Sequence, residues 1–572
     1  MIVLNSIFET EIDMATIREK IEGFLYPFYE RFTDMCYKGG EETEFMGVRL
    51  LDDDIKFTHG ALVNAAATLY AYYVRVSDKR AKEVLERLHY FIKIAASAVC
   101  KTWGKIAILR AYCTLDDAGL VGHIKPEYTE MVKEKTNYED FFDKDKLDVR
   151  GMATNYMQVA MACAGMRERL GWENDGYAKR IMEKLSDILQ STANDGWLDD
   201  EIPYGRFDRY SLVLSSEFAD TARIVGMQIP DFITKNIRRC AEIMLFTANN
   251  SGNGICYGRS VSVHGDSTAA EVLSTAIAEG LLSEDEKKRA VTYLMAIYEK
   301  KLSFWYDSDK ECFNMWWGGR GHDVYRPIDR LLETNLDAAN HMYMQLKSLA
   351  AGGAADIQAD GVIEASSDWE SKIVRFKKTA SDERATVILK RGERLVMLPF
   401  VAFGSHFGDH SEYYPVPFFS GGILEGPPSA DFPLFVPEYT DDAGTKYKPV
   451  QYFDKISYSA ENGKATVVAE GDLAIIENKH ARRSDIRFSL NYEFVENTIN
   501  VSINAGRDMK NAVMYTCGRP DAIATSTLGF DTCEDVKTCC EPQYRGVHGE
   551  LQNVKIHSVS SPATLGYRIV IK

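Results

Sequence analysis

The amino-acid sequence predicts a multidomain protein of the α-then-β class, with an N-terminal (α/α) toroid of helical hairpins followed by a C-terminal antiparallel β-sandwich. Its 572 residues are more than one ordinary hydrophobic core needs. From residue 58 to residue 349 the apolar residues recur at helical spacing. Beyond residue 361 they alternate instead, in short runs rich in Val, Ile, Phe and Tyr. The change of pattern indicates one domain of helices and one of strands.

The helical part is a succession of amphipathic segments separated by short turns rich in Gly, Asn, Asp or Lys, with no strand pattern between them. The predicted helices are residues 61–76, 81–98, 153–170, 178–193, 211–225, 268–279, 284–301 and 333–350. Helical hairpins in such a series close into a ring or stack as an open solenoid. No repeat of fixed period is present in this part, which favours the ring. We therefore predict an (α/α) toroid over residues 1–350.

The second domain is predicted over residues 361–572, after a flexible linker of small residues at 351–360. Its alternating runs are separated by turn sequences such as Asn462-Gly463, which is typical of antiparallel sheets. The predicted strands are residues 372–376, 385–389, 394–403, 455–459, 465–470, 486–494, 498–503, 512–517 and 567–572. These runs predict an antiparallel β-sandwich.

Charge and composition narrow the classes of partner and the location. The formal net charge of -17 argues against a nucleic-acid binder, because such proteins neutralise phosphates with clustered Lys and Arg. No window approaches the roughly 20 apolar residues that a membrane-spanning helix needs, so no membrane partner is expected. The first residues lack the basic and apolar regions of a signal peptide. Together with eleven cysteines, an odd number, this composition predicts a cytoplasmic protein.

The sequence contains no motif for a cofactor. It lacks a P-loop, a GxGxxG after a strand, HExxH and paired CxxC motifs. The one cysteine cluster, Cys533 with Cys539-Cys540, has neither a second CxxC nor a nearby histidine pair. We therefore predict no cofactor and no metal.

A block of carboxylates, arginines and aromatics at residues 195–210 is the strongest functional signal. Hydrolysis of a glycosidic bond uses two carboxyl groups, one protonated and one ionised. The candidates in and just after this block are Asp195, Asp199, Asp200, Glu201, Asp208 and Glu217. Trp197, Tyr204 and Tyr210 lie among them and offer flat faces to sugar rings. The alternative interpretation is a helix-ending turn with solvated acids.

Three arginines in this region, Arg206, Arg209 and Arg259, indicate the charge of the ligand. A guanidinium binds a carboxylate with two parallel hydrogen bonds, which a lysine does not reproduce. A uronic acid is the natural ligand for that geometry. For any one arginine, an ion pair with a neighbouring structural acid is the alternative.

A second cluster, from Tyr257 to Asp266, contains the residue types that an elimination needs. In elimination from a uronate, an arginine neutralises the carboxylate, a His or Tyr removes the C5 proton, and a Tyr protonates the departing oxygen. Tyr257, Arg259 and His264 would supply that set. A histidine near a helix start is also commonly a cap or a packed residue.

Two further segments are predicted to border the pocket. The loop at residues 316–326 is rich in glycine, aromatics and charge, and we take Trp316, Tyr325 and Arg326 as substrate-binding residues of its wall. A long insertion at residues 403–442 within the second domain is expected to reach toward the first.

The site residues fall into three short motifs: Asp195-Gly196-Trp197 with Asp199, Asp208-Arg209-Tyr210, and Tyr257-Gly258-Arg259-Ser260. These motifs resemble the bacterial domain-of-unknown-function family 2264. The resemblance implies an (α/α) toroid and an association with glycoside hydrolase family 154, which includes β-glucuronidases. More loosely, a toroid followed by a β-sandwich is similar to heparinase-like and hyaluronate-lyase-like polysaccharide lyases. The chain departs from the first family at Arg209, Val263 and His264, so the family pattern does not fix substrate or reaction type.

We therefore predict an enzyme that cleaves a glycosidic bond at a uronic acid of an acidic oligosaccharide, by hydrolysis in the manner of a β-glucuronidase. Asp199 and Asp208 are the predicted acid and base, in an order that stays open, and Arg206 and Arg259 hold the carboxylate. The residues predicted to stack on or orient the sugar are Trp197, Tyr210 and Tyr257. The alternatives are a lyase that uses His264 with Tyr257, and a non-catalytic sugar-binding protein. A homo-oligomer formed through the sandwich is a further expectation, by analogy.

Overall fold

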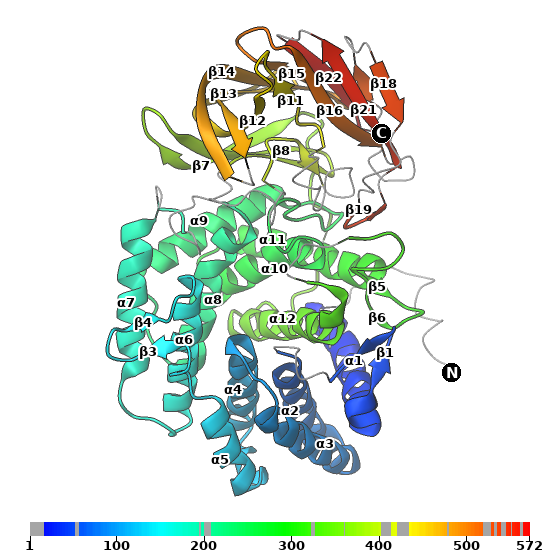
Figure 1. The fold of residues 1–572 in the computed structure, drawn as a ribbon. Helices are drawn as coiled ribbons and strands as arrows, with labels where there is room; N and C mark the ends of the chain where they lie inside the picture. Colours follow the sequence, from blue (N-terminus) through cyan, green and yellow to red (C-terminus); the bar gives the residue numbers. More distant parts are fainter. Residues whose placement is uncertain are drawn as a thin grey trace.

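The structure is a computed structural model with a helical domain and a β domain (Figure 1). It describes residues 16–51, 57–193, 196–198, 207–321, 326–359, 361–401, 413–419, 434–477, 480–518, 528–530, 535–538, 545–550, 552–560 and 564–571. In Figure 1 the helices α9, α10 and α11 lie nearest the β domain, while α3 and α5 lie farthest from it.

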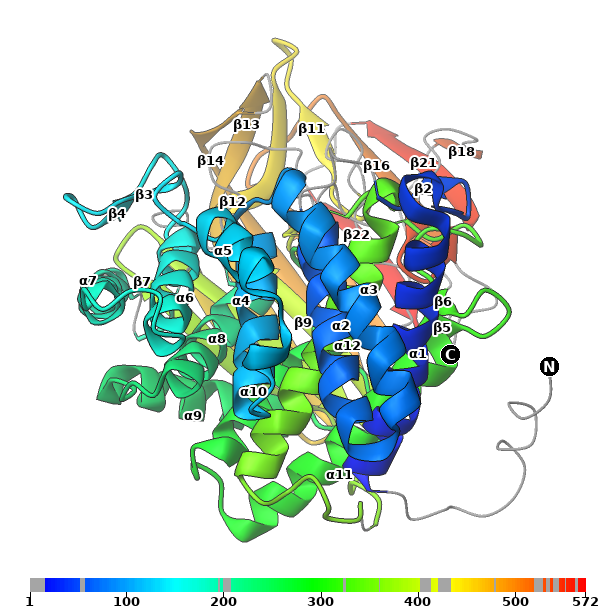
Figure 2. The same cartoon turned by 90° about the horizontal axis from the view of Figure 1, so that it is seen from below.

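The helical domain is a closed ring of hairpins. Its helices are α1 (Ile17–Gly39), α2 (Thr58–Val76), α3 (Asp78–Ser97), α4 (Thr102–Asp117), α5 (Pro126–Lys135), α6 (Asn155–Arg169), α7 (Tyr177–Thr192), α8 (Arg209–Val225), α9 (Asp231–Thr247), α10 (Val263–Ala278), α11 (Glu284–Lys300) and α12 (Leu331–Ala351). The even-numbered helices contact one another in order from α2 to α12, and α12 contacts α2. The odd-numbered helices pack outside this inner ring. In the view from the helical side, α7 lies at one edge of the helical part and α1 at the other (Figure 2). The predicted toroid is confirmed.

The eight predicted helices are present, and four further helices, α1, α4, α5 and α9, are not predicted by the sequence pattern. Inner helix α4 shows why, because it is buried on most of its faces, including at Lys105, Ile108 and Leu109. A helix that is buried on most of its faces has no polar face opposite an apolar one, so it lacks the amphipathic stripe that the sequence pattern detects. The starts of two helices are marked by capping sequences. Thr16 with Glu19, and Ser283 with Glu286, form capping boxes at the starts of α1 and α11.

The β domain is a sandwich of two antiparallel sheets, as predicted. The smaller sheet has the order β10 (Phe418–Phe419), β9 (Arg394–Phe400), β8 (Glu383–Arg391), β7 (Glu370–Lys378). The larger has the order β17 (Leu528–Phe530), β22 (Thr564–Val570), β15 (Thr498–Asn504), β14 (His480–Val495), β13 (Lys464–Glu477), β12 (Lys446–Glu461), β11 (Glu438–Thr440), β16 (Asn511–Gly518), β21 (Gln552–Ser560), β18 (Asp535–Thr538). Strand β12 contacts β7, β8 and β9, which places the sheets face to face.

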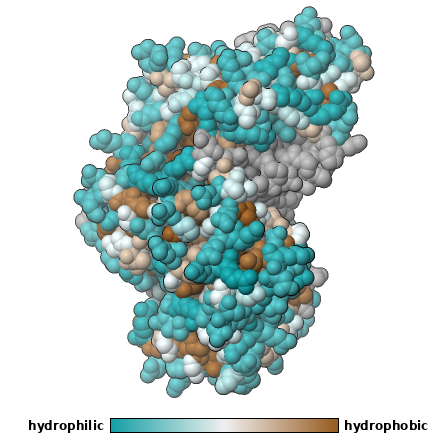
Figure 3. Space-filling view, turned by 90° about the vertical axis from the view of Figure 1, so that its left-hand side faces the viewer, coloured by the Kyte–Doolittle hydropathy of each residue, from teal (hydrophilic) through white to brown (hydrophobic). Residues whose placement is uncertain are grey.

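Short two-stranded ribbons occur in the loops. They are β1 (Glu44–Phe45) with β2 (Val48–Arg49), β3 (Phe142–Asp143) with β4 (Asp148–Val149), β5 (Tyr306–Asp307) with β6 (Cys312–Phe313), and β19 (Arg545–Gly546) with β20 (Gly549–Glu550). The apolar side chains of the described residues gather inside the two domains. The face drawn in Figure 3 is accordingly mainly hydrophilic, with hydrophobic residues scattered among polar ones.

The segment between the domains is packed, unlike the flexible linker that its small residues predict. Ala354 and Ala355 are buried, and the Ala355 carbonyl accepts a hydrogen bond from the Arg18 amide at 3.1 Å. Arg18 also pairs with Asp356, with Nε and Oδ1 2.6 Å apart. These contacts hold the segment against the start of α1, because small side chains allow close approach as readily as they allow flexibility.

The domains also meet through side chains. Phe207 stacks on Phe376 of β7, with ring centroids 5.4 Å apart, and Lys390 of β8 donates to the Ala248 carbonyl at 2.6 Å. Tyr413 of the predicted insertion donates a hydrogen bond to Asp208 in the helical domain. The described part of that insertion therefore does reach the first domain.

Gly60 provides a test of the ring packing, because it lies where α2 meets α4. A Cβ added there would lie 2.4 Å from the Gly104 carbonyl oxygen. Gly60→Ala must therefore push two inner helices apart, and we expect a destabilisation of about 1–3 kcal/mol. Gly23→Ala in α1 is the matched control, since its Cβ would meet no atom within 4 Å. It should be neutral or stabilising by up to about 1 kcal/mol. Melting temperatures followed by circular dichroism would measure both, and equal values would contradict the packing.

Candidate active site inside the helical ring

A cavity of about 290 Å³ opens inside the ring, and a deeper chamber of about 90 Å³ adjoins it. The two share six lining residues: Trp103, Ile106, Arg110, Glu217, Asp337 and His341. The other residues of the outer cavity are Phe57, Ala61, Asn64, Ala107, Ala153, Asn155, Tyr156, Arg209, Tyr210, Arg259, Arg326, Arg330, Glu333, Leu336 and Asn340. The lining is therefore rich in arginine, carboxyl, amide and aromatic groups.

The inner helices α2, α4, α6, α8 and α12 begin at this cavity. Ala61 and Asn64 are near the start of α2, Asn155 and Tyr156 open α6, and Arg209 opens α8. The first turns of α4 and α12 also line the cavity. A helix start carries partial positive charge from its unpaired N–H groups. Several starts converging on one cavity favour an anionic ligand.

Five arginines line the outer cavity, and three of them have carboxylate partners. Arg209 pairs with Glu271 at 2.5 Å and Arg259 with Asp208 at 2.9 Å, while Arg330 pairs with Glu333. The other two, Arg110 and Arg326, make no ion pair with a carboxylate in the part of the chain that the structure describes. They are the guanidinium groups most able to receive a carboxylate from a ligand.

Arg326 is oriented by two contacts. Its Nη1 donates to the Ser260 hydroxyl at 2.8 Å, and its own carbonyl accepts from the Trp316 indole N–H at 2.7 Å. The Ser260 hydroxyl also lies 2.8 Å from the Tyr210 hydroxyl. Ser260 and Ser262 have φ values of 56° and 65°, in the left-handed region that costs most side chains energy. The strained turn thus holds the Ser260 hydroxyl between Arg326 and Tyr210, which both line the cavity.

Glu217 is the carboxyl group best suited to hold a proton. Burial, followed by the negative charge of Glu271, raises the pKa of Glu217 to about 7. Its side chain lines both the cavity and the chamber and accepts no hydrogen bond from another described residue. At neutral pH a large fraction of Glu217 is therefore protonated and directed at the ligand space.

Asp337 is the complementary, ionised carboxyl group. Burial opposes its ionisation, but the positive charge of His341, 3.4 Å away, holds the pKa of Asp337 well below its usual range. Burial likewise opposes the charge of His341, but Asp337 and Glu271 raise the pKa of the imidazole to about 9. Protonated and ionised carboxyl groups therefore share one cavity, an arrangement that suits acid and base roles.

The structure separates the predicted site residues into three groups. Tyr210, Arg259 and Arg326 line the cavity, as do the further candidates Arg209 and Glu217. Asp199, Arg206 and Tyr325 lie outside the described residues, as do the alternative candidates and cysteines Asp195, Asp200, Glu201, Tyr204, Cys533, Cys539 and Cys540. The remaining predicted residues, Asp208, Tyr257, His264, Trp197 and Trp316, are described but are not among the lining residues.

Asp208, Tyr257 and His264 are buried behind the cavity wall. Asp208 caps helix α8 and pairs with Arg259, and the Tyr257 hydroxyl donates to the Phe207 carbonyl at 2.5 Å. His264 lies in the first turn of α10, and burial lowers its pKa well below the usual value. In this structure their surroundings are protein, so these side chains support the site from behind.

The two predicted tryptophans also contact protein. Trp197 packs edge-on against Phe207 and carries the Arg239 guanidinium 4.3 Å from its ring. Trp316 supports the segment that carries Arg326. Aromatic side chains suit sugar rings, which is the basis of the prediction, but an aromatic next to a charged segment serves packing equally well.

Several cavity residues were not predicted, among them Arg110, Glu271, Asp337 and His341. In α12 the cavity residues Glu333, Asp337 and His341 recur every four positions, which puts them on one face of the helix. A polar stripe on a helix of otherwise apolar character was the signal that could have found them. Arg110 and Glu271 are isolated charges in apolar helices and carry a weaker version of the same signal.

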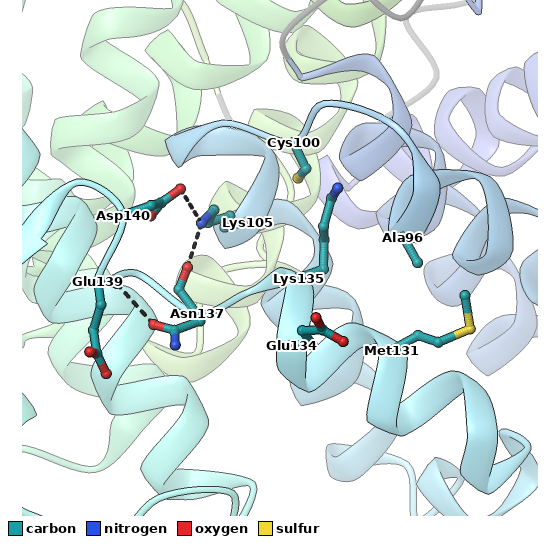
Figure 4. A pocket seen from close by; sticks show the side chains of 9 residues that line it. All are labelled: Ala96, Cys100, Lys105, Met131, Glu134, Lys135, Asn137, Glu139 and Asp140. Carbon is teal, nitrogen blue, oxygen red and sulfur yellow. Dashed lines mark hydrogen bonds and ion pairs between the residues drawn. The ribbon is translucent and has the colours of Figure 1, made fainter.

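A larger hollow of about 500 Å³ lies outside the ring, lined by residues of α3, α4 and α5 and the loop after α5 (Figure 4). Lys105 at its edge is already paired with Asp140, with Nζ and Oδ2 2.7 Å apart, and donates to the Asn137 carbonyl. Its described lining contains neither an arginine nor an aromatic ring. The hollow suits an acidic saccharide less well than the cavity inside the ring.

Comparison with known proteins gives structural matches at low identity. No protein-family model and no curated protein match the chain. The crystal structure of heparinase III matches with a TM-score of 0.48 and 10% identity over 99% of this chain and 86% of that one. The chondroitin AC lyase of Streptomyces coelicolor A3 in complex with chondroitin sulphate gives 0.47 and 9% over 98% and 80%. An unsaturated glucuronyl hydrolase from Bacillus sp. GL1 gives 0.38 and 13% over 59% and 97%.

The resemblance to family 2264 and to glycoside hydrolase family 154 stays a prediction, because no family model matches. Among the described residues, no group of three His, Cys, Asp or Glu side chains could hold a metal ion. None of the described helices combines the length and the apolar character needed to cross a membrane.

The raised pKa of Glu217 can be tested through stability. The folded protein favours the neutral carboxyl, so this contribution is complete below pH 4.5, the usual pKa, and is lost as the pH rises through about 7. Glu217→Gln keeps a neutral side chain at every pH. The variant should therefore gain stability relative to the parent over this interval, by up to about 3 kcal/mol.

Melting temperatures of parent and variant at a series of pH values would measure this difference. Glu183→Gln, on the exposed surface of α7, is the matched control and should track the parent throughout. A constant difference between Glu217→Gln and the parent from pH 4.5 to pH 8 would contradict the assignment.

Proposed function

We propose that this chain is an enzyme that cleaves an acidic saccharide at a uronic acid, with the cavity inside the helical ring as its active site. The observation that carries the proposal is the pairing, within one cavity, of an arginine without a carboxylate partner in the described chain and a carboxyl group whose pKa is raised to about 7. Arg326 is that arginine, and Glu217 is that carboxyl group.

The cavity suits a uronate in particular. The protein as a whole carries a net charge of -17, so an anionic ligand must be held by local positive groups. Arg326 and Arg110 provide two guanidinium groups, and the converging helix starts add partial positive charge. Tyr156 and Trp103 offer aromatic faces, and the amides of Asn64 and neighbouring residues offer hydrogen bonds to hydroxyl groups.

Hydrolysis is the reaction that this arrangement supports best. In the proposed reaction Glu217 donates its proton to the departing glycosidic oxygen. Asp337, held ionised by His341, acts as the base or nucleophile. Asp208, the acid or base expected from the sequence, instead holds Arg259 in the proposed mechanism.

Turnover of uronate substrates tests this proposal. Oligosaccharides with β-linked glucuronate should release free glucuronate without a rise in ultraviolet absorbance. Glu217→Gln should lower kcat by about 10²- to 10⁴-fold, the usual contribution of a general acid. Glu183→Gln is again the control and should match the parent. Uronate binding without turnover by the parent would instead indicate a non-catalytic sugar-binding protein.

A second candidate reaction, β-elimination, is favoured by the surroundings of Tyr210. Its hydroxyl contacts Ser260, which also accepts from Arg326, and the Arg259 guanidinium lies 4.6 Å from its ring centroid. In an elimination, a tyrosine hydroxyl held beside two guanidinium groups takes the C5 proton of the uronate whose carboxylate those groups neutralise. Elimination would yield an unsaturated uronide, so ultraviolet absorbance would rise and Tyr210→Phe would abolish activity while Glu217→Gln retained it.

The role of Arg326 gives a separate prediction. Removing a charged hydrogen-bond donor that meets the substrate carboxylate should raise KM by about 10- to 100-fold in Arg326→Ala. Arg326→Lys should recover little, because a lysine lacks the paired donors. Arg180→Ala, on the exposed face of α7, is the control. The assay compares KM for a glucuronide and for the corresponding glucoside, and a parallel rise for both would remove Arg326 from carboxylate recognition.

A further inference from the structure

A side chain from the other domain, Tyr413, belongs to the wall behind the cavity. It lies 205 residues after Asp208 in the chain and is fully buried. Its hydroxyl donates to Asp208 Oδ2 and accepts from Arg259 Nε at 3.1 Å. A single phenol therefore contacts both members of the buried ion pair.

These contacts define one edge of the Arg259 guanidinium. Its Nε lies 2.9 Å from Asp208 Oδ2, and its Nη2 lies 3.4 Å from Oδ1. The group also lies with Cζ 4.6 Å from the Tyr210 ring centroid, and Arg259 lines the cavity. A charged group that is buried on one side needs partners with fixed geometry to hold one orientation. The carboxylate and the phenol supply that geometry.

The backbone leaves little room for another arrangement. Gly258 has a φ of 84°, and a Cβ there would lie 2.6 Å from the Asp208 Cβ and 3.4 Å from the Tyr413 ring. The edge of the Tyr413 ring meets Tyr257, with centroids 6.5 Å apart. Tyr257 in turn contacts Thr386 of β8, with hydroxyl oxygens 2.8 Å apart. Tyr413 is thus packed against Gly258 and Tyr257, and Tyr257 is itself joined to the β domain through Thr386.

We propose that Tyr413 is a positioning residue for uronate recognition, through which the β domain fixes the Arg259 guanidinium against Tyr210. This inference rests on the proposed function, since it adds the cavity-lining Arg259 to Arg326 and Arg110 as a positive group that meets the substrate carboxylate. The second domain then completes the binding site inside the helical ring rather than merely covering it. Without the phenol, Arg259 Nε loses an acceptor and Asp208 loses a donor.

Tyr413→Phe tests the proposal because it keeps the ring and removes the hydroxyl. KM for a glucuronide should rise about tenfold, while KM for the matching glucoside stays unchanged. Tyr439→Phe is the matched control. Tyr439 is also fully buried in the sandwich, but its hydroxyl has no hydrogen-bond partner among the described residues. This control should leave both constants at the parent values.

A purely structural role would give a different result. If the phenol only fills space between the domains, Tyr413→Phe should change both KM values alike or neither, and either outcome overturns the proposal. A crystal structure of the variant decides the question without activity. The guanidinium should leave its position 4.6 Å from the Tyr210 ring centroid. An unmoved Arg259 would contradict the inference, whereas a moved Arg259 in a protein that turns over no uronide would remove only the proposed function.

Discussion

The arrangement of the site depends on the buried ion pair between Asp208 and Arg259. Asp208 caps helix α8, and Arg259 belongs to the tight turn before α10, so the pair joins two segments of the inner ring. Both side chains are almost fully excluded from water. Loss of one member would leave a buried charge without its partner, which typically costs about 3–5 kcal/mol. Tyr210 and Tyr413 both contact this pair, and Ser260 directly follows Arg259 in the chain.

A second network sets the protonation of the cavity. Glu271 contacts both Arg209 and His341, and His341 also lies near Asp337. Neighbouring positive groups lower the pKa of Glu271 and Asp337, so these carboxyl groups stay ionised. Glu217 has no ion pair among the described residues, and burial raises its pKa to about 7. Different environments thus give chemically similar groups different charges, the condition on which acid and base pairs depend. The helical ring creates these different environments because it brings charged side chains from several helices into one small volume.

Much of the fold could be predicted from the sequence, because helical spacing and strand alternation are local properties. These patterns predict the ring and the sandwich, but they do not detect buried helices such as α4. Part of the site also followed. Tyr210, Arg259 and Arg326 were identified from clustered charges and aromatics, and they line the cavity. Glu217 is also one of several candidate acids in the sequence, but the spacing of these acids does not show which of them is buried.

By itself, then, the sequence determined the two domain types, the segments that border the cavity and the residue types suited to a uronate. The tertiary structure decided which of those side chains face the cavity. In the folded protein, Asp208 and Tyr257 are buried behind the cavity wall. His341 and Tyr413 reach the cavity and its wall from positions far along the chain. The physical reason is that burial, charge pairing and domain contact depend on partners that are distant in sequence. The local sequence pattern identifies the type of residue, but it does not show which distant residue that side chain will contact in the folded protein.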